Sequence, residues 1–165
     1  MPHLRDGLIV AKVGIRATRE PLSSHMLIFR GGEVTEEALD HLAAAWIRYC
    51  HASKDSAEPF EAFWAIEEEH DLFFEGKSEE LWRLILKIHE RDHSIAVQQV
   101  LSAGPIENLL SKFGEEYIER VEDKAREDPT FAKLLGGVWK SSMSDEIWSR
   151  LQAVWDRTGW DGIPE

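Results

Sequence analysis

The chain has 165 residues, a formal net charge of −12 and seven tryptophans. Its length suits one globular domain, and its 43% hydrophobic and 30% charged residues exclude a disordered chain. The sequence contains no run of about 18 apolar residues, so no transmembrane helix is predicted. Its net negative charge disfavours binding along the phosphate backbone of a nucleic acid. The residues after Met1 lack the pattern of a secretory signal, so we expect a cytoplasmic protein with neither nucleic acid nor membrane as partner.

The first 34 residues differ in composition from the rest of the chain. Residues 8–15 and 25–30 are short segments rich in branched apolar side chains, and Gly, Pro or Ser flanks each of them. This pattern predicts two strands, which a hairpin would join. We therefore expect an N-terminal extension with a β segment over residues 1–34, followed by a helical domain over residues 35–165.

Helices are predicted from Thr35 to near the end of the chain. Thr35, Ser78 and Ser144 each precede two acidic residues, which is typical of a helix N-cap followed by acids at the positive end of the helix dipole. Apolar residues then recur at helical spacing, and Trp46, Trp82, Trp148 and Trp155 fall on these stripes. We expect those tryptophans to belong to the core.

Further helix boundaries are marked by Pro and Gly. Pro59 is expected to begin a helix with an apolar stripe of Phe60, Phe63, Trp64 and Phe74, and Ser94 to cap another. Gly104-Pro105 and Gly114 are predicted to end helices, and Asp128-Pro129 to begin one. The expected fold is all-α, with about eight short antiparallel helices in a helical-repeat-like stack or an irregular bundle.

Negative charge is concentrated in two stretches of the sequence. Residues 58–80 hold nine acids and one base, which is −8 of the total −12, and residues 107–128 hold eight acids and four bases. One interpretation is a solvated helix surface; the other is a docking surface for a basic protein. The candidate contact residues are Glu67, Glu68, Glu69, Asp71, Glu75, Glu115, Glu116, Glu119 and Trp160, where Trp160 either folds back or serves as an exposed anchor.

The segment His89-Glu90-Arg91-Asp92-His93 fits the H-E-x-x-H pattern. On one helix, this spacing places two imidazoles on the same face as zinc ligands, with the glutamate as general base. Two charged residues inside the motif and the new helix expected at Ser94 favour a polar connection instead, with His89 near a helix C-terminus. We expect no cofactor, and keep His89 and His93 as the alternative metal ligands.

The single Cys50 cannot form an internal disulfide or a cysteine metal cluster. It lies near the end of an apolar stripe, and no His or Asn signature accompanies it. We therefore predict a buried structural thiol rather than a nucleophile.

Several short motifs resemble those of a bacterial family that is classified only as a domain of unknown function. They are Ala103–Leu110 (AGPIENLL), Phe113-Gly114, Asp128–Phe131 (DPTF) and Leu135–Trp139 (LGGVW), with a tryptophan-containing helix at Leu81–Leu86. The likeness spans roughly residues 38–152; Phe113 stands where the family tends to have His. The resemblance implies a small helical bacterial domain and supplies no catalytic residues.

Three functions follow as hypotheses. The first is a non-enzymatic protein-binding domain, such as a bacterial immunity protein that neutralises a basic toxin through its acidic surface. The second is a zinc-dependent hydrolase that uses His89, Glu90 and His93. The third is a helical scaffold or homodimer whose N-terminal strands pair between chains.

Overall fold

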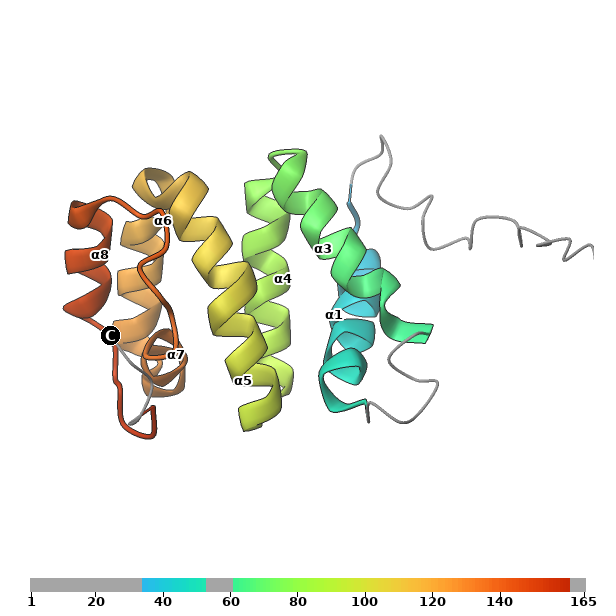
Figure 1. Cartoon of the computed structure of the whole chain (residues 1–165). Helices are drawn as coiled ribbons and strands as arrows, with labels where there is room; N and C mark the ends of the chain where they lie inside the picture. The colour runs from blue at the N-terminus through green and yellow to red at the C-terminus, as the bar shows by residue number, and fades with distance from the viewer. Residues whose placement is uncertain (1–33, 53–60, 161–165) are drawn as a thin grey trace, which may run out of the picture.

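The computed structural model describes residues 34–52 and 61–160, and every regular element in these ranges is helical (Figure 1). This confirms the all-α prediction. The expected N-terminal strands lie outside the described residues. In chain order the elements are α1 (Glu36–His51), α3 (Trp64–Phe74), α4 (Ser78–Arg91), α5 (Ile95–Leu101), the π-helical turn η2 (Ser102–Ile106), α6 (Glu107–Glu127), α7 (Pro129–Leu135) and α8 (Asp145–Gln152).

All three predicted helix starts are confirmed, but the predicted N-cap is correct only at Thr35 and Ser144 and is wrong at Ser78. The Thr35 hydroxyl accepts a hydrogen bond from the Ala38 amide at 3.2 Å, and Ser144 caps α8 in the same way. Ser78 is instead the first residue inside α4, after Lys77. Its hydroxyl accepts a hydrogen bond from the Tyr117 hydroxyl at 3.1 Å, so a contact between helices uses the group that the sequence assigned to capping.

The predicted break at Gly104-Pro105 is wrong, because the chain continues through it as the π-helical turn η2. Such a wide turn leaves a backbone carbonyl without its usual amide donor, which suits a proline that has none to give. The helix bends further along, where Phe113 has φ −122° and ψ 20°. This bend confirms the predicted stop at Gly114 and divides α6 into two segments.

Helices α1, α4, the second segment of α6, and α8 run side by side in the same direction (Figure 1). For α1, α4 and α6, ion pairs show this shared direction, because the residue numbers of both partners increase together along the two helices. Glu36 pairs with Arg83 and His51 with Asp92, and then Glu79 pairs with Arg120 and His89 with Asp128. The helices α3 and α5 return in the opposite direction between them. The repeated down-and-up path agrees with a stack of helix pairs.

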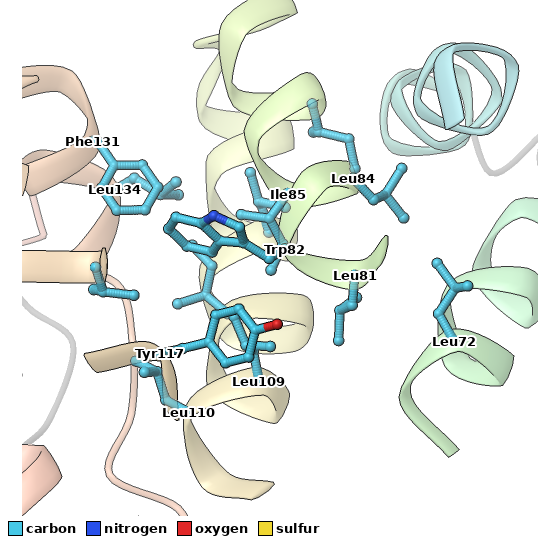
Figure 2. Close-up of a cluster of buried hydrophobic side chains, with 14 of the residues drawn as sticks. Leu72, Leu81, Trp82, Leu84, Ile85, Leu109, Leu110, Tyr117, Phe131 and Leu134 are labelled. Atoms are coloured by element: carbon cyan, nitrogen blue, oxygen red, sulfur yellow. The ribbon is translucent and has the colours of Figure 1, made fainter. Parts of the chain in front are cut away.

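The core is centred on α4 and the helices beside it (Figure 2). The Trp82 ring lies 6.0 Å from the rings of Tyr117 and Phe131, and Leu81 and Ile85 are fully buried. Replacing a buried aromatic residue of this kind by alanine costs about 3–5 kcal/mol. Trp46 and Trp82 are core residues as expected, whereas Trp148 and Trp155 are only partly buried against the core.

The predicted apolar stripe of α3 is wrong at Phe63 and Phe74, whereas Trp64 packs partly buried against the core, and Pro59 and Phe60 lie outside the described residues. Phe63 and Phe74 are 45% and 71% exposed, and the buried residues of this helix are Ala65, Glu68, Glu69 and Leu72. These positions follow the i, i+3, i+4, i+7 spacing of a single helix face. The contacts with α1 and α4 orient that face inward, so two glutamates enter the interior and two phenylalanines stay outside. Within the described part of the chain, no helix is long and apolar enough to cross a membrane.

Candidate functional site

The starts of the parallel helices meet at one end of the molecule, and each start carries two acidic residues. We call this region the acidic end; its acid pairs are Glu36-Glu37 on α1, Glu79-Glu80 on α4, Glu115-Glu116 on α6 after the bend, and Asp145-Glu146 on α8. Carboxylates in the first turn of a helix are favoured by its dipole. The parallel packing therefore gathers side chains that are up to 110 positions apart in the sequence.

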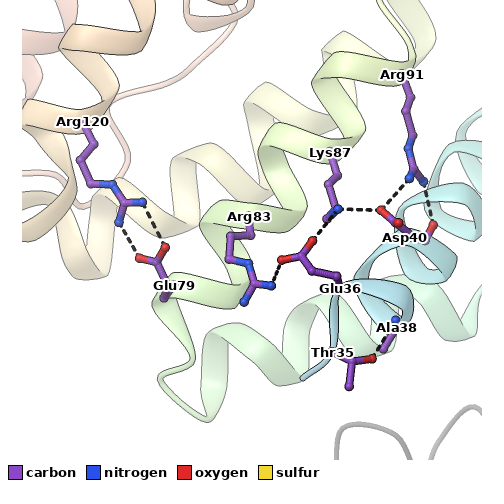
Figure 3. A network of polar contacts seen from close by, with 9 residues as sticks. All are labelled: Thr35, Glu36, Ala38, Asp40, Glu79, Arg83, Lys87, Arg91 and Arg120. Atoms are coloured by element: carbon purple, nitrogen blue, oxygen red, sulfur yellow. Dashed lines mark hydrogen bonds and ion pairs between the residues drawn. The ribbon is translucent and has the colours of Figure 1, made fainter. Parts of the chain in front are cut away.

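In three of these four pairs, one acid forms an ion pair within the protein, and Figure 3 shows those of Glu36 and Glu79. Arg83 and Lys87 contact Glu36, and Lys140 contacts Asp145. Arg120 holds Glu79 with two hydrogen bonds, of 2.5 and 3.1 Å. The hydrogen bond from Arg120 lowers the pKa of Glu79. Glu36 and Glu79 thus connect neighbouring helices, whereas Asp145 is paired with a lysine in the connection that precedes its own helix.

Most of the remaining acids of the acidic end are exposed, whereas Glu80 is half-buried. Glu37, Glu115 and Glu116 are exposed, and none of them forms an ion pair with a described residue. Glu119, one turn further along α6, is exposed as well. Uncompensated carboxylates on one surface produce a negative potential that attracts a basic partner and accelerates its association.

The candidate residues of α3 do not form the single patch that the sequence predicted. Glu75, after the last residue of α3, is exposed at the acidic end, where its carboxylate lies 2.8 Å from the Lys77 ammonium. Asp71 is half-buried one turn before it. Glu67 is exposed but lies near the start of α3, towards the other end of the stack.

Two of the predicted contact residues, Glu68 and Glu69, are buried, with 5% and 2% of their surfaces exposed. They cannot contact a partner, because they lie on the face of α3 that packs inward. The Glu69 Oε1 atom has no hydrogen-bond partner among the described residues, and burial raises the pKa of Glu69 to about 7. The sequence could not distinguish them from Glu67, because it shows only that three consecutive glutamates on a helix point in different directions.

Trp160 is also not a surface anchor. It is 5% exposed, and its indole Nε1 donates a hydrogen bond to the Lys133 carbonyl oxygen at 2.7 Å. The ring packs against Gly137 so closely that a Cβ atom there would lie 2.5 Å from it. Of the two interpretations of this residue, the folded-back tail is the correct one.

Beside the acidic end lies an exposed aromatic residue that was not among the predicted contact residues. Phe74 is 71% exposed, and its ring lies 5.2 Å from that of Phe73. Phe73 in turn contacts Phe113 at the bend of α6, which brings the end of α3 close to the start of Glu115-Glu116. The sequence alone did not single it out, because Phe74 falls on the outer side of α3 only once Ala65, Glu68, Glu69 and Leu72 are known to face inward.

The H-E-x-x-H segment does not lie on one helix, because α4 ends at Arg91 and His93 belongs to the following connection. His89 is 1% exposed, and its Nε2 lies 3.2 Å from an Asp128 carboxylate oxygen and 3.3 Å from the Thr130 hydroxyl. Burial lowers the pKa of His89. Its ring lies 4.7 Å from that of His93. His89 thus links α4 to the start of α7, and no three His, Cys, Asp or Glu side chains in the described ranges are grouped to hold a metal ion.

Comparison with known proteins gives a family but no characterised relative. No curated protein and no solved structure matches this chain. A family of unknown function (DUF6869) matches residues 52–159. This range begins after α1, somewhat later than the resemblance in the sequence indicated, and extends almost to the buried Trp160. Since the match covers more than half of the chain, the protein belongs to this family of unknown function, DUF6869.

Proposed function

We propose that this chain is a non-enzymatic protein-binding domain whose acidic end docks on a basic surface of another protein. The observation that carries the proposal is the exposure of Glu37, Glu115 and Glu116, which form no ion pair with a described residue, at the end of the stack where the exposed Phe74 ring lies. Protein interfaces commonly combine a large aromatic anchor with a polar rim. Here Phe74 supplies the apolar anchor, and the carboxylates supply the rim and attract the partner over a distance.

The partner class that fits this surface best is a basic toxin, with this chain as its bacterial, cytoplasmic immunity protein. A basic nuclease has a cationic surface for nucleic-acid phosphates, and an acidic protein can cover that surface. The net charge of −12 and the small size of this chain are compatible with such a role. If this proposal is correct, the gene next to the one for this chain encodes the toxin.

The two alternatives draw less support from the contacts. A zinc hydrolase would need His89 and His93 on one helix with a third ligand, whereas His89 Nε2 faces Asp128 and Thr130. A scaffold or homodimer joined through N-terminal strands depends on residues outside the described ranges. Zinc analysis of protein purified without a histidine tag and the mass of the protein in solution test these alternatives directly.

The proposed docking is tested by affinity capture from the source organism with two double variants that change the charge equally. The first double variant, Glu115→Gln with Glu116→Gln, removes two charges at the acidic end. The second, Glu90→Gln with Glu127→Gln, removes two exposed charges near the last residues of α4 and α6, away from the acidic end. The bound protein is identified by mass spectrometry and its association rate is then measured.

We expect the first variant to slow association about tenfold and to reduce its salt dependence, while the second remains near wild type. Phe74→Ala is expected to accelerate dissociation without changing the salt dependence. If both double variants weaken binding equally, the attraction comes from the net charge and the acidic end is not the docking surface.

A further inference from the structure

A cavity of about 300 Å³ lies between the turn that follows α7 and the turn that follows α8, away from the Phe74 edge of the acidic end. Three indole rings contribute to its walls. The Trp148 and Trp155 rings lie 5.2 Å apart and nearly perpendicular, and Trp139 is 45% exposed. The core therefore leaves these aromatic surfaces partly uncovered. Ligand pockets typically have such mainly apolar and aromatic walls with a few polar groups.

The charge of this cavity is opposite to that of the protein as a whole. Its lining includes Lys140 and Arg157, and none of the described lining residues is acidic. The Arg157 guanidinium lies over the Trp155 ring, 5.0 Å from its centroid, and forms no ion pair within the described chain. Lys140 forms an ion pair with Asp145, a residue that does not line the cavity. A chain with net charge −12 thus presents, at an aromatic wall, a cation that has no ion-pair partner among the described residues.

The wall formed by residues 136–141 is held in place by tight packing. A Cβ atom on Gly137 would lie 2.5 Å from the Trp160 ring and 2.6 Å from the Ser102 hydroxyl, so glycine is needed for this approach. Ser141 has φ 43°, a left-handed conformation that a residue other than glycine rarely adopts. A wall fixed in this way requires little ordering when a ligand enters, which favours binding.

We propose that this cavity binds a small molecule with a flat aromatic body and a carboxylate group. The indole rings would contact the aromatic body through stacked or edge-to-face arrangements. The Arg157 guanidinium can form a bidentate pair with a carboxylate, and its position over Trp155 places it beside the body of the ligand. A cavity of about 300 Å³ has the volume of about ten water molecules in the liquid, which suits a molecule of one or two fused rings.

The test compares two probes of the same shape, 2-naphthoate and the uncharged 2-naphthamide. Binding to the full chain is followed by the NMR signals of the indole N–H groups. We expect 2-naphthoate to shift the signals of Trp139, Trp148 and Trp155 but not that of the buried Trp46. The amide is expected to bind about five- to tenfold more weakly.

Arg157→Gln is expected to reduce the affinity for 2-naphthoate to that for the amide, and to leave amide binding unchanged. Arg83→Gln is the matched control, because it changes the net charge equally on α4, where its partner is Glu36. Trp139→Ala removes a partly exposed indole ring from the cavity wall and is expected to weaken the binding of both probes by the same factor. Circular dichroism confirms that each variant is folded.

The proposal is overturned if neither probe shifts the three indole signals, since the cavity is then not a ligand site. Equal affinities of wild type for the two probes would show that the cations do not select an anion. A loss of 2-naphthoate binding in Arg83→Gln as large as that in Arg157→Gln would assign the preference to overall charge rather than to the cavity.

Discussion

Glu69→Gln is expected to stabilise the protein, and to do so more at pH 8 than at pH 5. Glu69 is 2% exposed, its Oε1 has no partner among the described residues, and burial raises its pKa from 4.5 to about 7. The folded state therefore retains the proton at pH values where the unfolded chain has lost it. A carboxyl group with a raised pKa in the folded state destabilises the fold as pH rises through this window.

The size of the effect follows from the difference between the two pKa values. The change from 4.5 to about 7 corresponds to about 3 kcal/mol, since one pKa unit is equivalent to ~1.36 kcal/mol. Nearly all of this cost is present above pH 7, and most of it is absent at pH 5. Glutamine has the shape of the protonated side chain but does not ionise. The gain in unfolding free energy of Glu69→Gln over wild type should therefore be about 2–3 kcal/mol larger at pH 8 than at pH 5.

The measurement is urea unfolding of both proteins at the two pH values. Glu67→Gln is the matched control, because Glu67 lies two residues earlier on the same helix but is exposed. The gain in stability between pH 5 and pH 8 should be much smaller for Glu67→Gln than for Glu69→Gln. The reasoning is refuted if Glu69→Gln changes stability equally at pH 5 and pH 8, or if it is less stable than wild type at pH 8.

Two further expectations concern glycine packing and thiol reactivity. Gly137→Ala should destabilise the fold by about 2 kcal/mol or more in urea unfolding, because its Cβ would lie 2.5 Å from the Trp160 ring. At Gly104, no atom other than those of its chain neighbours lies within 4 Å of a new Cβ, so Gly104→Ala should cost clearly less than Gly137→Ala, its remaining cost being the contact of that Cβ with the ring of the following Pro105; a comparable loss in both variants would contradict the packing explanation. Burial, together with Asp92, raises the pKa of the Cys50 thiol to about 12, so a thiol reagent at pH 8 should modify the native protein far more slowly than the urea-unfolded chain. Equal rates would show that Cys50 is accessible and ionised in the fold.

Local sequence patterns correctly predicted the helical class and many helix boundaries. Thr35, Ser144 and Asp128 precede helices because their side chains accept the free amide hydrogens of the first turn, which requires only neighbouring residues. The inward residues of the second segment of α6 were also predictable, since 3.6 residues per turn places them on one face. Where a tertiary contact competes with the local pattern, as at Ser78, the pattern failed.

Tertiary packing alone decided which acidic residues face water and which aromatic residues are covered. Glu67, Glu68 and Glu69 are chemically identical in sequence, and the contacts of α3 with α1 and α4 bury the last two. The same packing leaves Phe74 exposed and covers Trp160. The composition, with its net charge of −12, determined that the protein would be acidic. Only the parallel arrangement of α1, α4, α6 and α8 gathered the acidic helix starts at one end, because sequence periodicity specifies a helix face but not the neighbour against which it packs.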